Sequence, residues 1–286
     1  MRVAIIGGGG KMGSWFARYF DSRGYSVSIS DINKNSAKLV ADSLGIEMAE
    51  SNREAVTDAD IVLVSVPINS VIDVISGLEP YMSDDSVLIE ISSIKSGIVP
   101  QLSNIVRDSI TTVSLHPMFG PAVEGIKDRT IAVSPVASEE REVSISRCLF
   151  EEAKIFVVGH KEHDNIMAVN LSLTYCLNVA FSGVLDDLDL DILKRLGGTT
   201  FPVQLALAES VINEEPDLVY HLIRENQFSG FYLNEFMNKF NHLREALDNK
   251  EAFDEFYNRL KLSLERDPDY RYADERRYKA FKALED

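Results

Sequence analysis

The sequence has 286 residues, enough for two domains or one large one, and a net charge of −16 from 45 acidic and 29 basic side chains. Such a charge repels nucleic-acid phosphates and anionic lipid, so neither nucleic acid nor a membrane is an expected partner. The same excess means that an anionic small molecule needs a local basic pocket. No run of about 18 uncharged apolar residues, the length of a membrane span, is expected.

The two cysteines, Cys148 and Cys176, follow neither disulfide nor metal-ligand spacing. The chain starts with Met1 and Arg2, which lead directly into an apolar strand without the pattern of a signal peptide. These features predict a reduced protein of the cytoplasm that holds no metal.

Strand and helix signals alternate through the first half of the chain. The apolar runs that predict strands are 2–6, 25–30, 59–67, 86–92, 112–115, 130–134 and 154–158. The amphipathic runs that predict helices between them are 11–24, 35–45 and 68–82. Apolar strands that alternate with helices predict a parallel sheet covered on both faces.

The pattern changes near residue 160, where strand signals end and glycine becomes rare. Four long amphipathic stretches follow, at 163–185, 202–213, 216–248 and 251–264. We therefore expect a Rossmann-like, doubly wound α/β domain at 1–160 and an all-α domain at 161–286.

A glycine-rich loop joins the first predicted strand to the first helix. Gly8, Gly10 and Gly13 form the pattern G-x-G-x-x-G in the stretch VAIIGGGGKMG. The first glycine permits a tight turn, the second lets the backbone approach a pyrophosphate, and the third lets the helix pack closely. Lys11 and Met12 open that helix, whose N-terminal N–H groups face the phosphate charge. The loop predicts a dinucleotide site, and a purely structural turn is the alternative.

Asp31 follows the next predicted strand, where an acidic residue accepts hydrogen bonds from the adenosine ribose. Its charge repels a 2′-phosphate, so the sequence favours NAD over NADP. Pro67 ends the strand 59–67 and is expected either to shape the cofactor cleft or simply to terminate that strand.

His116 lies at the end of a predicted strand, in the stretch VSLHPMFGP. Ligands of doubly wound sheets bind beyond the carboxyl ends of the strands, which is where the nicotinamide is expected. Pro117 and Pro121 restrict the backbone around the imidazole, which suits a group that meets a substrate hydroxyl at about 3 Å. A second strand end, EISSIKSG, supplies Ser93 to orient the imidazole and Lys95 to neutralise substrate charge. We therefore predict that His116 is catalytic, with a packed turn histidine as the alternative.

Five motifs carry a resemblance to the prephenate dehydrogenase family, which includes arogenate dehydrogenases. In chain order they are IIGGGGKMG, VSVPI, EISSIKSG, HPMFGP and GHKEHD. The resemblance extends from residue 1 to about 265 and implies a nucleotide-binding domain followed by a helical domain that forms a homodimer. It implies the oxidative decarboxylation of prephenate to 4-hydroxyphenylpyruvate, with hydride transfer to NAD, in tyrosine biosynthesis.

The resemblance also assigns residues. It makes His116 the catalytic histidine, which accepts a hydrogen bond or proton from the ring hydroxyl, and Ser93 the serine hydrogen-bonded to it. Tyr175 stands where family members carry a second histidine, and Gln204 where they carry an arginine that holds a substrate carboxylate. We predict that Tyr175, Gln204 and Lys95 bind the substrate, although an amide does not replace a bidentate guanidinium.

Two other functions stay open. One is a same-fold oxidoreductase of arogenate or another carboxylated alcohol, and the other is a non-catalytic NAD-binding paralogue. The stretch HKEHD, with His160, His163 and Asp164, is interpreted as a structural feature of the domain junction rather than a metal cluster. The aromatic-rich stretch 228–240 suits a dimer surface or internal core packing equally well.

Overall fold

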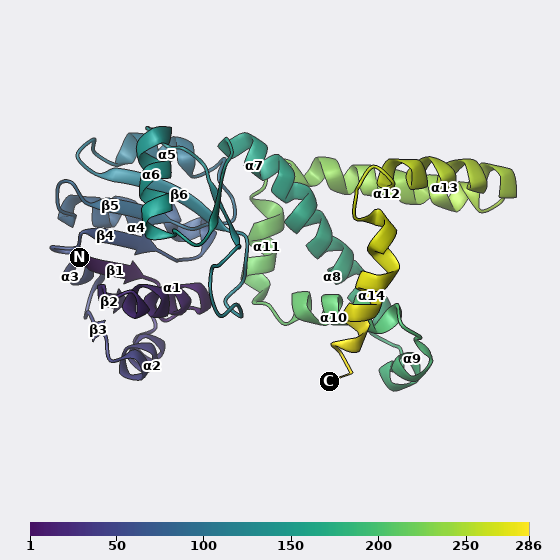
Figure 1. The fold of residues 1–286 in the computed structure, drawn as a ribbon, viewed down its shortest axis with the longest axis horizontal. Helices are drawn as coiled ribbons and strands as arrows, with labels where there is room; N and C mark the ends of the chain where they lie inside the picture. Colours follow the sequence, from purple (N-terminus) through teal and green to yellow (C-terminus); the bar gives the residue numbers. More distant parts are fainter. Residues whose placement is uncertain (286) are drawn as a thin grey trace. The chain divides into compact units, whose positions relative to one another are not determined.

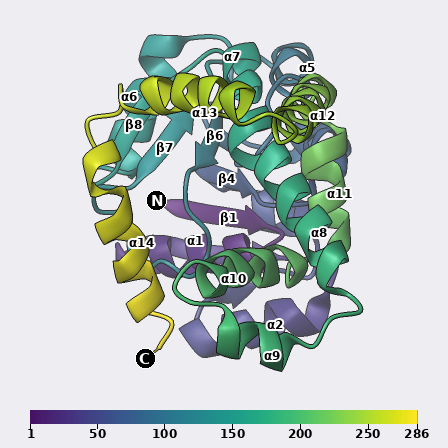
Figure 2. The same cartoon turned by 90° about the vertical axis from the view of Figure 1, so that its right-hand side faces the viewer.

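The computed structural model describes residues 1–285 and divides into two compact units, Met1–Met167 and Ala168–Asp286. We call the first the N-terminal unit and the second the helical unit. Figure 1 shows that the strands belong to the N-terminal unit, and Figure 2 shows the helices of the other.

The N-terminal unit is built on one eight-stranded sheet with the order β3-β2-β1-β4-β5-β6-β7-β8. The pairs from β3 to β6 are parallel, as is β7 with β8, but β6 and β7 are antiparallel. The Rossmann-like sheet is confirmed, whereas the expectation of a wholly parallel sheet is wrong at β7. The strands are β1 (Arg2–Ile6), β2 (Ser26–Ser30), β3 (Glu47–Met48), β4 (Ile61–Val64), β5 (Val87–Glu90), β6 (Thr111–Pro117), β7 (Thr130–Val133) and β8 (Lys154–Val157).

Helices cover both faces of this sheet (Figure 1). Side chains alternate along a strand, so Val3 and Ile5 of β1 join one buried cluster while Ala4 and Ile6 join the other. The first cluster includes residues of α1 (Lys11–Ser22), α2 (Lys34–Leu44) and α6 (Glu139–Leu149). The second includes residues of α3 (Asn52–Val56), α4 (Val71–Leu78) and α5 (Val99–Ile105). The unit also contains α7 (His160–Met167) and the 3₁₀ turns η1 (Ile68–Ser70) and η2 (Glu79–Tyr81).

An aromatic cluster fixes α1 against the sheet. Phe16 and Phe20 are fully buried, and each ring centroid lies 6.1 Å from that of Phe150. Such aromatic pairs add to the stabilisation that comes from burying the rings. The indole Nε1 of Trp15 donates to the carbonyl oxygen of Val123 at 2.7 Å. These contacts fix the position of the helix that the glycine-rich loop precedes.

The helical unit contains no strand within the part of the chain that the structure describes. Its helices are α8 (Thr174–Leu185), α9 (Leu190–Leu196), α10 (Phe201–Ile212), α11 (Pro216–Arg224), α12 (Ser229–Ala246), α13 (Lys250–Leu264) and α14 (Ala273–Lys282), with η4 (Tyr270–Tyr272) before the last. The single helix expected at 216–248 is two helices, α11 and α12. Asn226 separates them, because its side-chain oxygen accepts from the N–H of Phe228 at 3.0 Å, which closes a local turn.

The stretch His160–Leu185 forms one continuous helical run, because the π-helical segment η3 (Ala168–Leu173) joins α7 to α8. This run is long and apolar enough to cross a membrane, by length and composition alone. The expectation that no stretch reaches that length is therefore wrong. Only 17% of its most apolar window is buried, so the run exposes apolar surface.

Candidate active site

The carboxyl ends of four neighbouring strands form one row across the sheet. The register pairs Ile6 with Val64, Val64 with Glu90, and Glu90 with Ser114. Adjacent strands are spaced by about 4.8 Å, so the row from β1 to β6 is about 14 Å long. The glycine-rich loop follows Ile6, and His116 lies two residues beyond Ser114. The loop predicted to bind the cofactor and the histidine predicted to react therefore lie at the same edge of the sheet.

The glycine-rich loop has no room for side chains where it packs against β2 and against itself. Gly7 has a φ of +83°, in the left-handed region that favours glycine. A Cβ on Gly8 would lie 2.6 Å from the Cβ of Ile29, and one on Gly13 would lie 2.1 Å from the carbonyl oxygen of Gly7. The loop therefore presents bare backbone at the start of α1, as close approach of a pyrophosphate requires. The sequence pattern did not single out Gly7 as the residue of the tight turn.

The start of α1 suits an anion. The helix begins at Lys11 with Gly10 as its N-cap, no side-chain cap and no acidic residue in the first turn. The first N–H groups of a helix have no intrahelical partner, and the helix dipole adds partial positive charge there. Lys11 is exposed and Met12 half-buried at this position. The loop and the helix start together fit the phosphates of a dinucleotide.

Asp31 lies beside the loop, just after β2. Its Oδ2 accepts from the backbone N–H of Gly9 at 2.9 Å, and its Oδ1 accepts from that of Asn33 at 2.8 Å. Each carboxylate oxygen has a further lone pair, so both remain able to accept from ribose hydroxyls. Pro67 is exposed and caps η1, three residues beyond the end of β4. The residues predicted to bind the cofactor thus gather at one edge of the N-terminal unit.

Lys95 does not have the position predicted for a substrate-binding group. Its side chain is fully buried, and its Nζ donates to Oε1 of Glu90 at 2.6 Å and to the carbonyl oxygen of Leu115 at 2.5 Å. Burial lowers the pKa of Lys95, and the charges of Glu90 and Asp164 oppose that effect. The ammonium therefore neutralises an internal carboxylate and holds the β5 loop to β6.

Ser92, rather than the predicted Ser93, belongs to this buried network. The Ser92 hydroxyl donates to Oε2 of Glu90 at 2.5 Å, and the hydroxyl of Ser114 donates to Oε1 of the same carboxylate. Ser93 is half-buried and makes no side-chain hydrogen bond to His116 in the described structure. The predicted serine–histidine pair is therefore absent, and another residue meets the imidazole.

His116 is the second-to-last residue of β6 and is only 6% exposed. Its Nδ1 lies 2.9 Å from Nε2 of His163, and it makes no other side-chain hydrogen bond within residues 1–285. Burial, followed by the charges of His163 and Lys95, lowers the pKa of His116 well below its usual value. The imidazole is therefore neutral near pH 7, as a proton acceptor must be.

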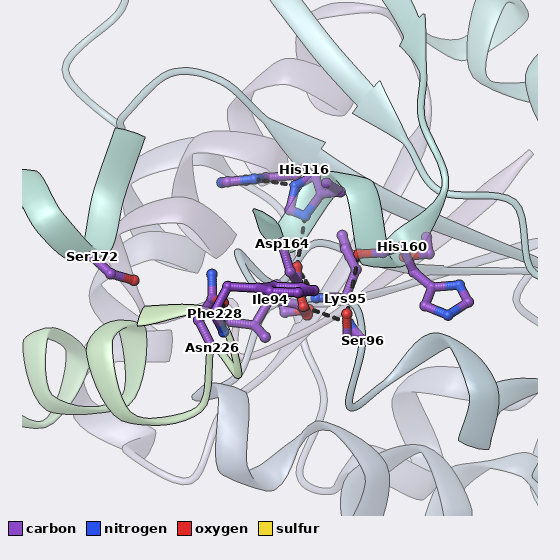
Figure 3. A network of polar contacts seen from close by, with 12 residues as sticks. Ile94, Lys95, Ser96, His116, His160, Asp164, Ser172, Asn226 and Phe228 are labelled. Carbon is purple, nitrogen blue, oxygen red and sulfur yellow. Dashed lines mark hydrogen bonds and ion pairs between the residues drawn. The ribbon is translucent and has the colours of Figure 1, made fainter. Parts of the chain in front are cut away.

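His163 and Asp164 lie on α7, the helix that ends at the boundary between the two units. The Nδ1 of His163 lies 2.8 Å from Oδ1 of Asp164. Asp164 also accepts from the backbone N–H of Lys95 at 2.8 Å and of Ser96 at 2.7 Å. Figure 3 shows Asp164, Lys95 and Ser96 close together beside His116. The sequence signal was present in HKEHD, but the separation of 47 positions between the two histidines concealed their contact.

Comparisons with known proteins indicate the family of this chain. The family model described as "Prephenate dehydrogenase, nucleotide-binding domain" matches residues 16–132. A probable arogenate/prephenate dehydrogenase of Methanocaldococcus jannaschii is 26% identical over 257 residues, covering 88% of this chain and 58% of the relative. These matches support the prephenate dehydrogenase family. The resemblance predicted from the motifs is thereby confirmed.

Solved structures agree in fold. A prephenate dehydrogenase from Aquifex aeolicus, in complex with hydroxyphenyl propionate and NAD+, has a TM-score of 0.77 at 21% identity and covers 93% of this chain and 97% of its own. A Synechocystis arogenate dehydrogenase has a TM-score of 0.72 at 18% identity, with 94% and 100% covered. The α/β sheet followed by a helical portion is therefore the fold of these enzymes.

The two remaining predicted residues lie in the helical unit. Tyr175 is half-buried on α8, and the side-chain Nε2 of Gln204 on α10 donates to Oδ1 of Asn178 at 2.9 Å. The amide nitrogen of Gln204 thus joins α10 to α8, and the substrate roles of Tyr175 and Gln204 stay predictions. The structure also brings the guanidinium of Arg277 to the hydroxyl of Thr199, near the start of α10. No local sequence pattern predicts this contact, because the two residues are 78 positions apart.

The buried ion pair of Lys95 and Glu90 leads to a prediction for stability. In Lys95→Met, the Glu90 carboxylate stays buried without its cation, so unfolding should become easier by about 3–5 kcal/mol. The double variant Lys95→Met with Glu90→Gln should recover most of that loss. Urea denaturation followed by the fluorescence of Trp15, the only tryptophan, reports the N-terminal unit.

The matched control is Lys154→Met, since Lys154 pairs with Asp128 at 3.3 Å on the exposed surface. Its unfolding midpoint should stay close to that of the unaltered protein. Equal midpoints for the Lys154 and Lys95 single variants would contradict the structural role of the buried pair.

Proposed function

We propose that the protein is a cytoplasmic, NAD-dependent prephenate dehydrogenase of tyrosine biosynthesis. The observation that carries the proposal is the position of His116, buried at the same sheet edge as a loop fitted to dinucleotide phosphates. The reaction takes prephenate and NAD+ to 4-hydroxyphenylpyruvate, CO2 and NADH. Bound NAD+ supplies the hydride acceptor, held by Gly8, Gly10, Gly13 and Asp31 with the start of α1.

His116 acts on the hydroxyl at C4 of the substrate ring. Its Nδ1 faces His163, so Nε2 is the ring nitrogen that meets this hydroxyl. Nε2 accepts the hydroxyl proton as the C4–H bond breaks and the hydride leaves with its electron pair. The bond from C1 to the carboxylate then breaks, CO2 departs, and its electrons complete the aromatic ring. The proton returns to the phenolic oxygen, so His116 ends the cycle neutral. Aromatisation makes the reaction effectively irreversible, so the protein mainly has to position and polarise the substrate.

Arogenate, or another carboxylated alcohol, is the second candidate substrate. Arogenate has the same ring and hydroxyl, so the chemistry at His116 is identical. The two substrates differ in the side chain, which carries a keto group in one and an ammonium in the other. Gln204 at the position of the family's arginine supports a site that recognises this end by hydrogen bonds rather than by a guanidinium.

The formation of NADH with prephenate and with arogenate, measured separately by absorbance, tests the proposal. We expect turnover of at least one substrate, with prephenate preferred. His116→Asn should lower kcat by about 100-fold or more, since general-base catalysis contributes that much, and should leave the Kd for NAD+ nearly unchanged. NAD+ binding without turnover of either substrate would instead favour a non-catalytic paralogue.

Asp31→Ala tests the cofactor preference. Removing the carboxylate removes its hydrogen bonds to the ribose and its repulsion of a 2′-phosphate. The Kd for NAD+ should rise by about tenfold or more, as expected for a charged hydrogen bond, and the preference for NAD+ over NADP+ should fall. Calorimetry with both nucleotides measures this ratio. Asp42→Ala, at an exposed position of α2, is the control. An unchanged ratio in Asp31→Ala would remove Asp31 from the cofactor site.

We further propose a homodimer formed through the helical unit. In the aromatic-rich stretch 228–240, Phe231 is 62% and Phe240 is 52% exposed, which leaves large apolar side chains uncovered. Light scattering should give twice the mass of one chain. Phe231→Asp combined with Phe240→Asp should give monomers, whereas Leu39→Asp, at an exposed position of α2, should stay dimeric. A monomeric unaltered protein would overturn the dimer, and recovery in the membrane fraction would assign the exposed helices to lipid.

A further inference from the structure

Three side chains form a continuous polar chain that ends at His116. Oδ1 of Asp164 lies 2.8 Å from Nδ1 of His163, and Nε2 of His163 lies 2.9 Å from Nδ1 of His116. All three are almost fully buried, at 0%, 1% and 6% exposure. Water therefore has little access to these contacts, and the three ring nitrogens that make them pair within the chain.

The direction of the hydrogen bonds follows from the carboxylate. Burial alone would raise the pKa of Asp164, but hydrogen bonds from His163 and from the backbone N–H groups of Ser96 and Lys95 lower it. Asp164 is therefore ionised, and an ionised carboxylate only accepts. Nδ1 of His163 must then carry a proton and donate it to Asp164.

A neutral imidazole with its proton on Nδ1 has a lone pair on Nε2. The Nε2 of His163 thus accepts, and the Nδ1 of His116 must donate to it. We propose that Asp164 and His163 are positioning residues, which hold His116 in the tautomer protonated on Nδ1 and leave its Nε2 as the proton acceptor. The part of this role that concerns the substrate hydroxyl rests on the proposed function.

A doubly protonated His163 would require the other tautomer of His116. If His163 were an imidazolium, both of its nitrogens would donate, and Nδ1 of His116 would have to accept. A neutral His116 would then carry its proton on Nε2, where it would donate to a substrate hydroxyl instead of accepting from it. The two assignments therefore differ in one observable, the ring nitrogen of His116 that bears the proton.

Nitrogen NMR of protein labelled with ¹⁵N at histidine reads this observable without any substrate. Protonated and unprotonated ring nitrogens have well-separated shifts, and His116→Asn assigns the signals by deleting one of the five histidines. Near pH 7 we expect His116 to be protonated on Nδ1 in the unaltered protein. His163→Leu, which removes the acceptor, should convert His116 to a mixture of both tautomers.

Kinetic measurements provide a second test of the positioning role. His163→Leu should lower kcat by about 100-fold or more, with KM and the Kd for NAD+ within about threefold, because positioning a base affects the chemical step. His163→Gln should restore kcat to within about tenfold of the unaltered protein. Its amide offers an oxygen to His116 and an N–H to Asp164, in the same order as the imidazole.

His160→Leu is the matched control on the same helix. Its ring points away from Asp164 in Figure 3, so kcat should match that of the unaltered protein. A proton on Nε2 of His116, or kcat within threefold of normal in His163→Leu, would overturn the positioning role. If the unaltered protein turns over neither substrate, the proposed function fails, while the NMR result still decides the tautomer. If His163→Leu does not fold, the tautomer of His116 in the unaltered protein and the kcat of His163→Gln decide whether His163 has the positioning role.

Discussion

The carboxylate of Asp164 is the buried charge on which the geometry of the site depends. It accepts from the backbone N–H groups of Lys95 and Ser96 and faces the ring nitrogen of His163. A buried carboxylate is costly unless hydrogen bonds fill its lone pairs, so these donors have to stay in place. The loop after β5, the helix α7 and, through His163, the end of β6 therefore share one constraint, although they are far apart in the sequence.

A second constraint comes from the charge next to this network. Lys95 is paired with Glu90 inside the N-terminal unit, so its positive charge influences His116 without reaching the surface. The same ammonium that anchors the β5 loop helps to keep the imidazole neutral. The binding of any anionic molecule by this acidic protein consequently depends on groups other than Lys95.

The sequence predicted the fold better than the contacts of the site. Alternating apolar runs identified most strands of the sheet, but a short run such as β7 carries no sign of its direction. Ser92 and Ser93 are adjacent and chemically equal, and only the path of the loop decides which one meets Glu90. Glu90 within the apolar run SVLIEIS was a usable signal, because a charge in a buried strand requires a partner. The contact of His116 with His163 depends on how α7 packs against the sheet, which no local pattern reports.

A base in this position has two opposing requirements. It must be neutral before it accepts a proton, and burial together with the nearby charges ensures this by disfavouring the imidazolium. In the proposed reaction, the same surroundings would resist the positive charge that develops on His116 as the substrate's hydroxyl proton arrives. In the proposed tautomer, the hydrogen bond donated from Nδ1 of His116 to His163, continued to the carboxylate of Asp164, offsets that resistance because it strengthens as the charge grows. In the proposed mechanism, His163 and Asp164 thus favour the protonated ring of His116 while the proton is held there, which is the condition for catalysis rather than for tight binding.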